Sequence, residues 1–253
     1  MTKLGNIQPD GIYEHLGVTD IAVQGIRPGG LQLTQRALTL SCLPPRSKVI
    51  DVGCGTGVTL EHIRLSQDHL AIGVDTSSNL LRFAKNRNRE LTVVRASGEY
   101  LPLPNQFFDG LLAECSLSLM SYSDESLSEF GRVLKVGGKI ILTDVYSRNP
   151  DVLDCPNDVS TKCCLRGAIS KELIIRKIEN NGFRVCLWED HSDLLKDFAV
   201  RLILSYGSLN HFWLQTTPGP VNPAQIQEAV RYLKPGYFLL IGQKTALTAH
   251  LET

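Results

Sequence analysis

The sequence has no excess of charge of either sign, because its 253 residues contain 26 Lys and Arg and 26 Asp and Glu. A nucleic-acid-binding domain usually has a basic excess or a basic stripe, and we find neither. No stretch approaches the roughly 20 apolar residues that a membrane-spanning helix needs. The composition therefore argues against nucleic-acid and membrane partners.

The first residues also have no apolar run behind their single lysine, Lys3, so we expect no secretory signal and a cytoplasmic location. Cysteine is better represented, at seven positions. The number is odd and the spacing is not that of a small secreted scaffold. In a cytoplasmic chain these cysteines are expected to be free thiols, metal ligands or small buried side chains, and not disulfides.

Short apolar runs alternate with helical patterns, which predicts an α/β fold with a mostly parallel sheet. The hydrophobic content of 43% is enough for one core. Strands are expected at residues 48–52, 70–74, 91–95, 109–114, 139–145, 183–189 and 237–242. We expect a single domain over residues 1–253.

Helices are expected from Gly29–Gly30 through Leu38, after the glycines at 53–57, from Ser77 or Ser78, from Ser123 or Asp124 to Gly137–Gly138, and at 170–181, 193–214 and 223–234. The polar segment 147–166 is expected to be a long loop, which in a compact domain is often functional. The domain is thus divided into an N-terminal flap (1–45), a cofactor-binding core (46–146), a substrate loop and helical cap (147–235) and a closing strand (236–243).

The segment Asp51-Val52-Gly53-Cys54-Gly55-Thr56-Gly57 lies between a predicted buried strand and a predicted helix. Its glycines allow a tight turn and a close approach of the backbone to a ligand. An NAD-dependent oxidoreductase is disfavoured, because the dinucleotide fingerprint has the spacing G-x-G-x-x-G. Asp75 ends the second predicted strand, where its carboxylate can accept hydrogen bonds from both hydroxyls of a ribose. The alternative is that the glycines are plain turn residues and Asp75 a helix cap.

This segment resembles motif I of the class I S-adenosylmethionine-dependent methyltransferases, and within them the type 11, ubiquinone-biosynthesis-like group. Asp75 matches the ribose-binding acid of that class. Residues 97–109 resemble its D-A-E-x-L-P-F segment, with Ser97 in place of the usual Asp, which implies a weaker or water-mediated adenine contact. Residues 129–138 resemble its E-x-x-R-V-L-K-P-G-G segment. The resemblance covers roughly residues 25–190 and implies S-adenosyl-L-methionine as cofactor and a Rossmann-like, seven-stranded, mostly parallel sheet with helices on both faces.

The resemblance, together with the helix start at Gly29–Gly30, gives a set of expected cofactor-binding residues. The backbone N–H groups of that helix start suit a carboxylate. No metal site is expected. The cofactor-binding set is Gly29, Gly30, Asp51, Gly53, Cys54, Gly55, Asp75, Thr76, Ser97, Gly98, Glu99 and Glu114.

The segment Cys163-Cys164-Leu165-Arg166-Gly167-Ala168 resembles arsenite methyltransferases, in which the cysteine of this segment binds trivalent arsenic. Thiolates are soft ligands that suit such a metalloid. We therefore hypothesise that Cys155, Cys163 and Cys164 lie near the acceptor, with Cys164 in contact with it. The alternative is that these cysteines are small buried packing residues.

The function implied by the resemblance is methyl transfer to a small-molecule acceptor, for which the enzyme mainly aligns the reactants. A hydroxyl or carbon acceptor would also need a base, for which His191 is a candidate. The sequence after the fourth strand, residues 114–117, lacks the Asn/Asp-Pro-Pro-Tyr motif of enzymes that methylate proteins or nucleic acids. Two alternatives stay open, which are an arsenite or thiol methyltransferase that uses the loop cysteines and an inactive methyltransferase-like binding module. The oligomeric state is not predicted.

Overall fold

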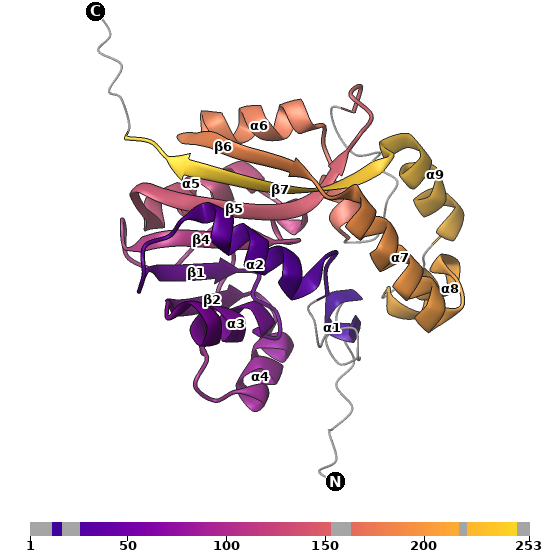
Figure 1. Cartoon of the computed structure of the whole chain (residues 1–253). Coiled ribbons are helices and arrows are strands. Elements are labelled where there is room, and N and C mark those ends of the chain that lie inside the picture. The colour runs from indigo at the N-terminus through magenta and orange to yellow at the C-terminus, as the bar shows by residue number, and fades with distance from the viewer. Residues whose placement is uncertain (1–11, 17–25, 153–162, 218–221, 247–253) are drawn as a thin grey trace, which may run out of the picture.

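A computed structural model of the chain describes residues 12–16, 26–152, 163–217 and 222–246. Its centre is a seven-stranded sheet in the order β3-β2-β1-β4-β5-β7-β6 (Figure 1). The strands are β1 (Lys48–Val52), β2 (Leu70–Asp75), β3 (Thr92–Arg95), β4 (Phe108–Glu114), β5 (Leu134–Ser147), β6 (Phe183–Asp190) and β7 (Pro235–Lys244). The α-helices are α1 (Ile12–Leu16), α2 (Gly30–Ser41), α3 (Val58–Gln67), α4 (Ser78–Arg87), α5 (Ser123–Val133), α6 (Lys171–Asn180), α7 (Ser192–Tyr206), α8 (Leu209–Thr216) and α9 (Pro223–Leu233), with short 3-10 helices η2 (Leu117–Leu119) and η3 (Cys164–Gly167).

The sheet is parallel from β3 through β5, and β7 runs antiparallel to both β5 and β6. The chain order reverses between β1 and β4. In an open α/β sheet, ligands bind at such a reversal, beyond the carboxyl ends of the strands. The expected Rossmann-like, seven-stranded fold is confirmed, and it directs attention to the ends of β1, β2 and β4.

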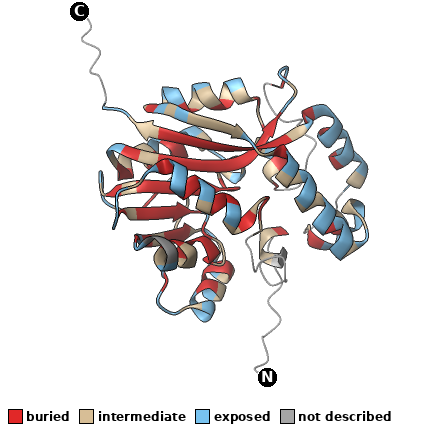
Figure 2. Cartoon of the chain, viewed as in Figure 1, coloured by how far each residue is buried: buried red, intermediate tan, exposed pale blue. Residues whose placement is uncertain are grey.

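Neighbouring residues of the central strands point to opposite faces of the sheet and feed two separate parts of the core. Val49, Leu112 and Ile141 pack with residues of α2, α3 and α4 on one face. Ile50 and Leu111 pack with residues of α5 and α6 on the other. Both faces are covered, so the strands read as continuous apolar runs. Figure 2 shows the central strands buried and the outward faces of the helices exposed.

The helix expected to end at Gly137–Gly138 ends four residues earlier, at Val133. β5 begins at the next residue, and both glycines lie inside it. The pairing register with β4 shifts between Phe108 and Gly110, and Gly137 has a φ of 80°. The glycines therefore serve an irregularity in the strand, a role typical of β-bulges, and the prediction of a helix stop was wrong.

The single helix expected over 193–214 is also two helices. Gly207 takes a φ of 80° and ends α7. The Ser208 hydroxyl then caps α8 by accepting a hydrogen bond from the backbone N–H of His211 at 3.1 Å. A serine cap directly after a left-handed glycine is a strong signal for a new helix, and the apolar pattern concealed it.

Helices α7, α8 and α9 occupy the connection between β6 and β7, where the sequence predicted a helical cap. Figure 1 shows them grouped beyond the end of the sheet, with α1 next to α8. None of the described helices is long and apolar enough to cross a membrane. Cys155 lies outside the described residues.

Candidate functional site

The glycine loop after β1 is tied to β2 and open on its other side. The backbone N–H groups of Gly53 and Cys54 both donate to the Val74 carbonyl, at 2.8 and 3.0 Å. Gly53 and Gly55 have φ values of 82° and 52°, in the region that favours glycine. A Cβ at Gly55 would meet no described atom within 4 Å. The loop thus presents bare backbone to open space, as close approach to a ligand requires.

Asp75 lies at the end of β2, directly beside this loop. Its Oδ2 accepts from the N–H of Gly55 at 2.8 Å and its Oδ1 from the N–H of Ser77 at 2.9 Å. Burial raises the pKa of Asp75, while these backbone hydrogen bonds lower it. A carboxylate offers about four acceptor sites. The backbone N–H groups of Gly55, Ser77 and Thr76 contact it, so capacity remains to accept from a ribose hydroxyl. The neighbouring Thr76 is exposed.

The segment Ser97-Gly98-Glu99 follows β3 and turns back, with the N–H of Tyr100 donating to the Ser97 carbonyl at 3.2 Å. Gly98 is buried, and a Cβ there would lie 2.7 Å from Sδ of Met120. The turn packs directly against the end of the Met120 side chain, in the segment after β4. The turn therefore lies beside the carboxyl ends of β2 and β4, as the resemblance implies for the adenine contact.

Arg27 and Glu114 form a buried ion pair, 2.9 Å between Nη2 and Oε2. The hydroxyls of Thr34 and Thr59 each donate to Glu114 at 2.7 Å and accept from Arg27 at 2.6 and 2.8 Å. Burial lowers the pKa of Arg27, but Glu114 and other acidic neighbours raise it by more than burial lowers it. The net effect is a raised pKa, so the guanidinium stays charged. Nε of Arg27 is buried without a hydrogen-bond partner among the described residues. An unsatisfied cationic donor suits the carboxylate of an amino-acid-like cofactor.

Other members of the expected cofactor-binding set have more ordinary surroundings. Asp51 is buried in β1, and burial and Glu114 raise its pKa well above the usual range. Burial likewise raises the pKa of the Cys54 thiol, so this thiol stays protonated. Gly29 has a φ of 75° and a Cβ there would lie 2.8 Å from Cβ of Leu33, so the start of α2 already favours this glycine.

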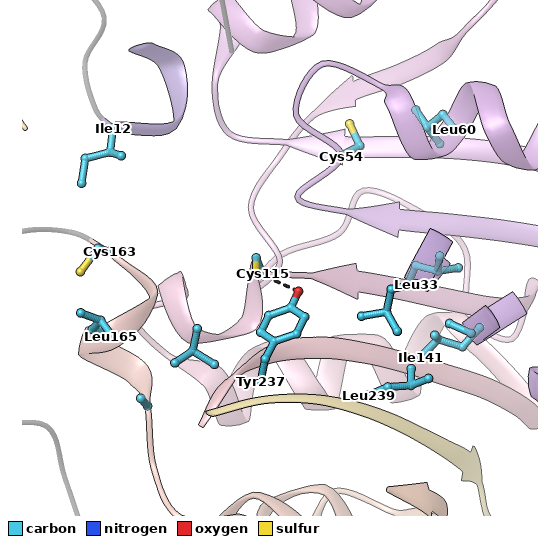
Figure 3. Packing of buried hydrophobic residues seen from close by; sticks show 14 of the residues in the cluster. Ile12, Leu33, Cys54, Leu60, Cys115, Ile141, Cys163, Leu165, Tyr237 and Leu239 are labelled. Carbon is cyan, nitrogen blue, oxygen red and sulfur yellow. Dashed lines mark hydrogen bonds between the residues drawn. The ribbon is translucent and has the colours of Figure 1, made fainter. Parts of the chain in front are cut away.

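An apolar cavity of about 180 Å³ lies beyond the carboxyl end of β4. Cys115, Cys163 and Cys164 line it together with hydrophobic residues of α1, α7 and α8. The lining residues are Ile12, Tyr13, Ile26, Pro28, Cys115, Val145, Cys163, Cys164, Leu165, Leu195, Phe198, Ala199, Leu202, Leu209, Phe212, Trp213, Val230 and Pro235. Figure 3 shows Cys163 and Ile12 at one side of this region and Cys115 at the other, with Cys54 apart in the glycine loop.

Three titratable groups of the lining, Tyr13, Cys115 and Cys164, are held neutral. The side chains of Tyr13 and Cys164 are hydrogen-bonded to each other, and burial raises the pKa of both. Burial also raises the pKa of Cys115, whose Sγ lies 3.1 Å from Oη of Tyr237 (Figure 3). Cys115 has a φ of 51°, a strained value for a residue other than glycine, of the kind that clusters at functional sites. Tyr13, Cys115 and Cys164 thus bring no charge to the cavity near neutral pH.

Sequence reasoning placed Cys163 and Cys164 near the acceptor region but did not identify the apolar cavity. Phe198, Leu202 and Phe212 belong to helices that read as ordinary amphipathic cap elements, and no local signal shows that their apolar faces enclose a space. His191 does not line the cavity, and its Nε2 lies 2.9 Å from Oε2 of Glu189. In the part of the chain that the structure describes, no group of three or more His, Cys, Asp or Glu could hold a metal ion.

Comparison with known proteins agrees with this geometry. Residues 50–142 match the model of a methyltransferase domain. The ubiquinone/menaquinone biosynthesis C-methyltransferase of Campylobacter jejuni is 26% identical over 186 residues, which cover 62% of this chain and 79% of that protein.

Two solved structures share the fold. Phosphoethanolamine N-methyltransferase 2 of Haemonchus contortus has a TM-score of 0.70 at 17% identity, over 95% of this chain and 61% of that one. Geranyl diphosphate C-methyltransferase of Streptomyces coelicolor has a TM-score of 0.63 at 16% identity, over 85% of this chain and 80% of that one. The resemblance to arsenite methyltransferases finds no support among these similarities. The matched domain at residues 50–142, the open glycine loop and the acidic end of β2 together support assignment of this chain to the class I S-adenosylmethionine-dependent methyltransferases.

Proposed function

We propose that this enzyme transfers a methyl group from S-adenosylmethionine to a small molecule held in the apolar cavity. The observation that carries the proposal is the position of Cys115 and Ser116. Ser116 packs against the cofactor loop, because a Cβ added at Gly53 would lie 2.4 Å from the Cβ of Ser116. Cys115, the preceding residue, lines the cavity. Two successive residues thus separate the proposed cofactor site from the proposed acceptor site.

S-adenosylmethionine, when bound, supplies an activated methyl group. The residues of this chain have to hold and align the reactants and to exclude water, and alignment can contribute about 7–11 kcal/mol. Asp75 and the bare backbone of Gly55 are suited to the nucleoside of the cofactor. Nε of Arg27, which has no hydrogen-bond partner among the described residues, is suited to its carboxylate. The carbon-lined cavity excludes water from the acceptor.

The cavity lining also bears on the kind of acceptor. No His, Lys, Arg, Asp or Glu is among the described lining residues, so the described part of the lining offers no ordinary general base. This favours an acceptor atom that is nucleophilic without removal of a proton by the protein. An acceptor with a large apolar part would fit the lining. The Campylobacter and Streptomyces enzymes are named as C-methyltransferases, and a carbon acceptor here would need a base from outside the described lining.

Methylation of a thiophilic acceptor such as arsenite is the second candidate. It is favoured by the position of Cys163 and Cys164 at the cavity. It is disfavoured by protonation, because thiolates are the metal-binding form and burial raises the pKa of Cys164. Cys164→Ser should abolish turnover with arsenite and spare cofactor binding if this candidate holds, and turnover that survives the change would exclude it.

The proposed cofactor site is tested by calorimetric titration with S-adenosylhomocysteine. Asp75→Ala should weaken binding about 10- to 100-fold, because it removes hydrogen bonds to a charged group. Asp68→Ala is the matched control, since Asp68 is an exposed carboxylate that pairs with the exposed Arg46. Equal affinity in the two variants would remove the ribose assignment. Cofactor binding without methyl transfer to any compound of a broad acceptor screen would instead indicate an inactive binding module.

A further inference from the structure

Helix α1, a single turn at residues 12–16, lies between the two proposed sites and contacts both. Its Glu14 accepts hydrogen bonds from Oγ of Ser77 and, at 2.9 Å, from Nδ2 of Asn79. Its Ile12 and Tyr13 line the acceptor cavity. Adjacent side chains of one helical turn thus face different parts of the site.

Ser77 connects Glu14 to Asp75, the proposed ribose-binding acid. Ser77 caps α4, since its hydroxyl accepts from the N–H of Leu80 at 3.1 Å. The backbone N–H of Ser77 donates to Oδ1 of Asp75 at 2.9 Å. Glu14 is also close enough to Asp75 for its charge to raise the pKa of that carboxyl. A ligand that fixes Asp75 therefore also fixes Ser77, and through Ser77 it acts on the position of Glu14.

The contacts on the other side lead to the acceptor. The hydroxyl of Tyr13 is hydrogen-bonded to the side chain of Cys164 in η3. Ile12 is buried, at 4% exposure, and α1 packs on α8 of the cap. A shift of α1 would change the lining of the cavity on the side that holds Cys163 and Cys164.

A helix of one turn has almost no stability of its own, because nucleation is unfavourable and its few internal hydrogen bonds do not repay it. The position of α1 is therefore set by its contacts with the loop after β2 and with the cavity. We infer that Glu14 is a positioning residue that couples the two sites, so that cofactor bound at Asp75 favours the α1 position that completes the acceptor cavity. This inference rests on the proposed function.

Such coupling is reciprocal and commonly amounts to about 5- to 150-fold in affinity. The test measures binding of the uncharged apolar fluorophore N-phenylnaphthylamine to the cavity, with and without saturating S-adenosylhomocysteine. In the native protein, S-adenosylhomocysteine should tighten binding of the fluorophore at least about 5-fold. In Glu14→Gln the tightening should fall to less than about 2-fold, while the affinity for the fluorophore without cofactor changes little.

Two further variants separate coupling from general damage. Glu90→Gln is the matched control, because Glu90 is an exposed carboxylate paired with Arg64 away from both sites, and it should keep the full coupling. Asn79→Ala removes a partner of the same carboxylate and should reduce the coupling in the same direction. Combined with Glu14→Gln it should add little, since both changes break one interaction.

Each outcome has a distinct meaning. Full coupling in Glu14→Gln, or an additive effect of the two changes, would overturn the inference and leave the proposed function intact. Absence of any effect of S-adenosylhomocysteine on fluorophore binding, with normal cofactor binding by calorimetry, would overturn it as well. Absence of cofactor binding itself would contradict the proposed function, and calorimetry reports that separately.

Discussion

At the residue scale, the buried pair of Arg27 and Glu114 carries charge into the interior beside the glycine loop. Their side chains are only 9% and 5% exposed, and two threonine hydroxyls complete the hydrogen bonding of Glu114. A buried charge is tolerated when it is paired in this way, and it becomes costly when one partner is removed.

Arg27→Met should therefore lower the free energy of unfolding by about 3–5 kcal/mol, because Glu114 is left buried without its counter-charge. Urea denaturation measures this loss. Arg36→Met is the matched control, because Arg36 pairs with Glu189 in the same way but is 52% exposed. A far smaller loss is expected there, since water solvates the remaining carboxylate. Similar losses in the two variants would contradict the assigned burial of the Arg27 pair.

Local spacing alone placed Gly53 and Gly55 in the loop after β1 and Asp75 at the end of β2, where the structure has them, and their contacts with the cofactor stay a prediction. The sequence placed Glu114 in the expected cofactor-binding set but gave no sign that Glu114 pairs with Arg27. These two residues are far apart in the chain, and no local pattern could join them.

At the scale of elements, Asp144 of β5 fixes the segment that follows β4. Its carboxylate accepts from the N–H and hydroxyl of Ser118, at 2.9 and 2.7 Å, and from the N–H of Val145 at 2.8 Å. The fixed segment includes Cys115 and Ser116, which lie between the proposed cofactor and acceptor sites. Burial raises the pKa of Asp144 to about 6, although the hydrogen bonds oppose this shift.

The raised pKa predicts how stability changes with pH. An unfolded aspartate has a pKa of about 3.9, so the folded protein holds this proton more tightly. The stability that the proton on Asp144 contributes is fully present below pH about 4 and is lost as the pH rises through about 6. Above that pH this group causes no further change in stability. Between these limits the native protein should lose about 3 kcal/mol more than Asp144→Asn, as measured by urea denaturation at several pH values.

Asp124→Asn is the control for that titration. Asp124 is an exposed carboxylate in α5 that pairs with Lys177, and its removal should leave the pH dependence between pH 4 and 6 almost unchanged. An identical pH dependence in the native protein and Asp144→Asn would show that Asp144 titrates normally. Any constant loss of stability from the missing acceptor does not affect this comparison, because only the slope is compared.

At the scale of elements the sequence predicted all seven strands, but it set two helix boundaries wrongly. Gly137 and Gly138 look like a helix stop, yet they lie within β5, because pairing with β4 begins already at Leu134. The apolar pattern around Gly207 predicted one helix over 193–214, yet Gly207 has a φ of 80° and α7 ends before it. A glycine in the sequence indicates an interruption of regular structure. The tertiary surroundings decide whether that interruption is a helix end or an irregularity within a strand.

At the scale of the whole molecule, the cap helices and α1 enclose the cavity on the side away from the sheet. Ala199 of α7 is a small residue in the lining, so a larger side chain there would occupy the space itself. The proposed cofactor site lies on the other side of Cys115 and Ser116 and should not be affected.

Ala199→Phe should therefore weaken binding of N-phenylnaphthylamine more than about 10-fold and leave the affinity for S-adenosylhomocysteine within about 2-fold, because a filled pocket excludes its ligand. Fluorescence titration and calorimetry measure the two affinities. Ala224→Phe is the control, since Ala224 is exposed at the start of α9. Unchanged fluorophore binding in Ala199→Phe would place the acceptor outside this cavity.

The sequence by itself determined the sheet, the glycine loop and the acid at the end of β2, because each depends on residues close together in the chain. Periodicity of apolar residues, the positions of glycines and the residue that follows a strand are local properties, and the parallel fold brings strand ends to one edge. The tertiary structure alone decided the pairing of Arg27 with Glu114, the contact of Glu14 with Ser77 and the apolar cavity. Each of these features joins side chains from distant parts of the chain. Each therefore exists only once the helices and strands have packed together.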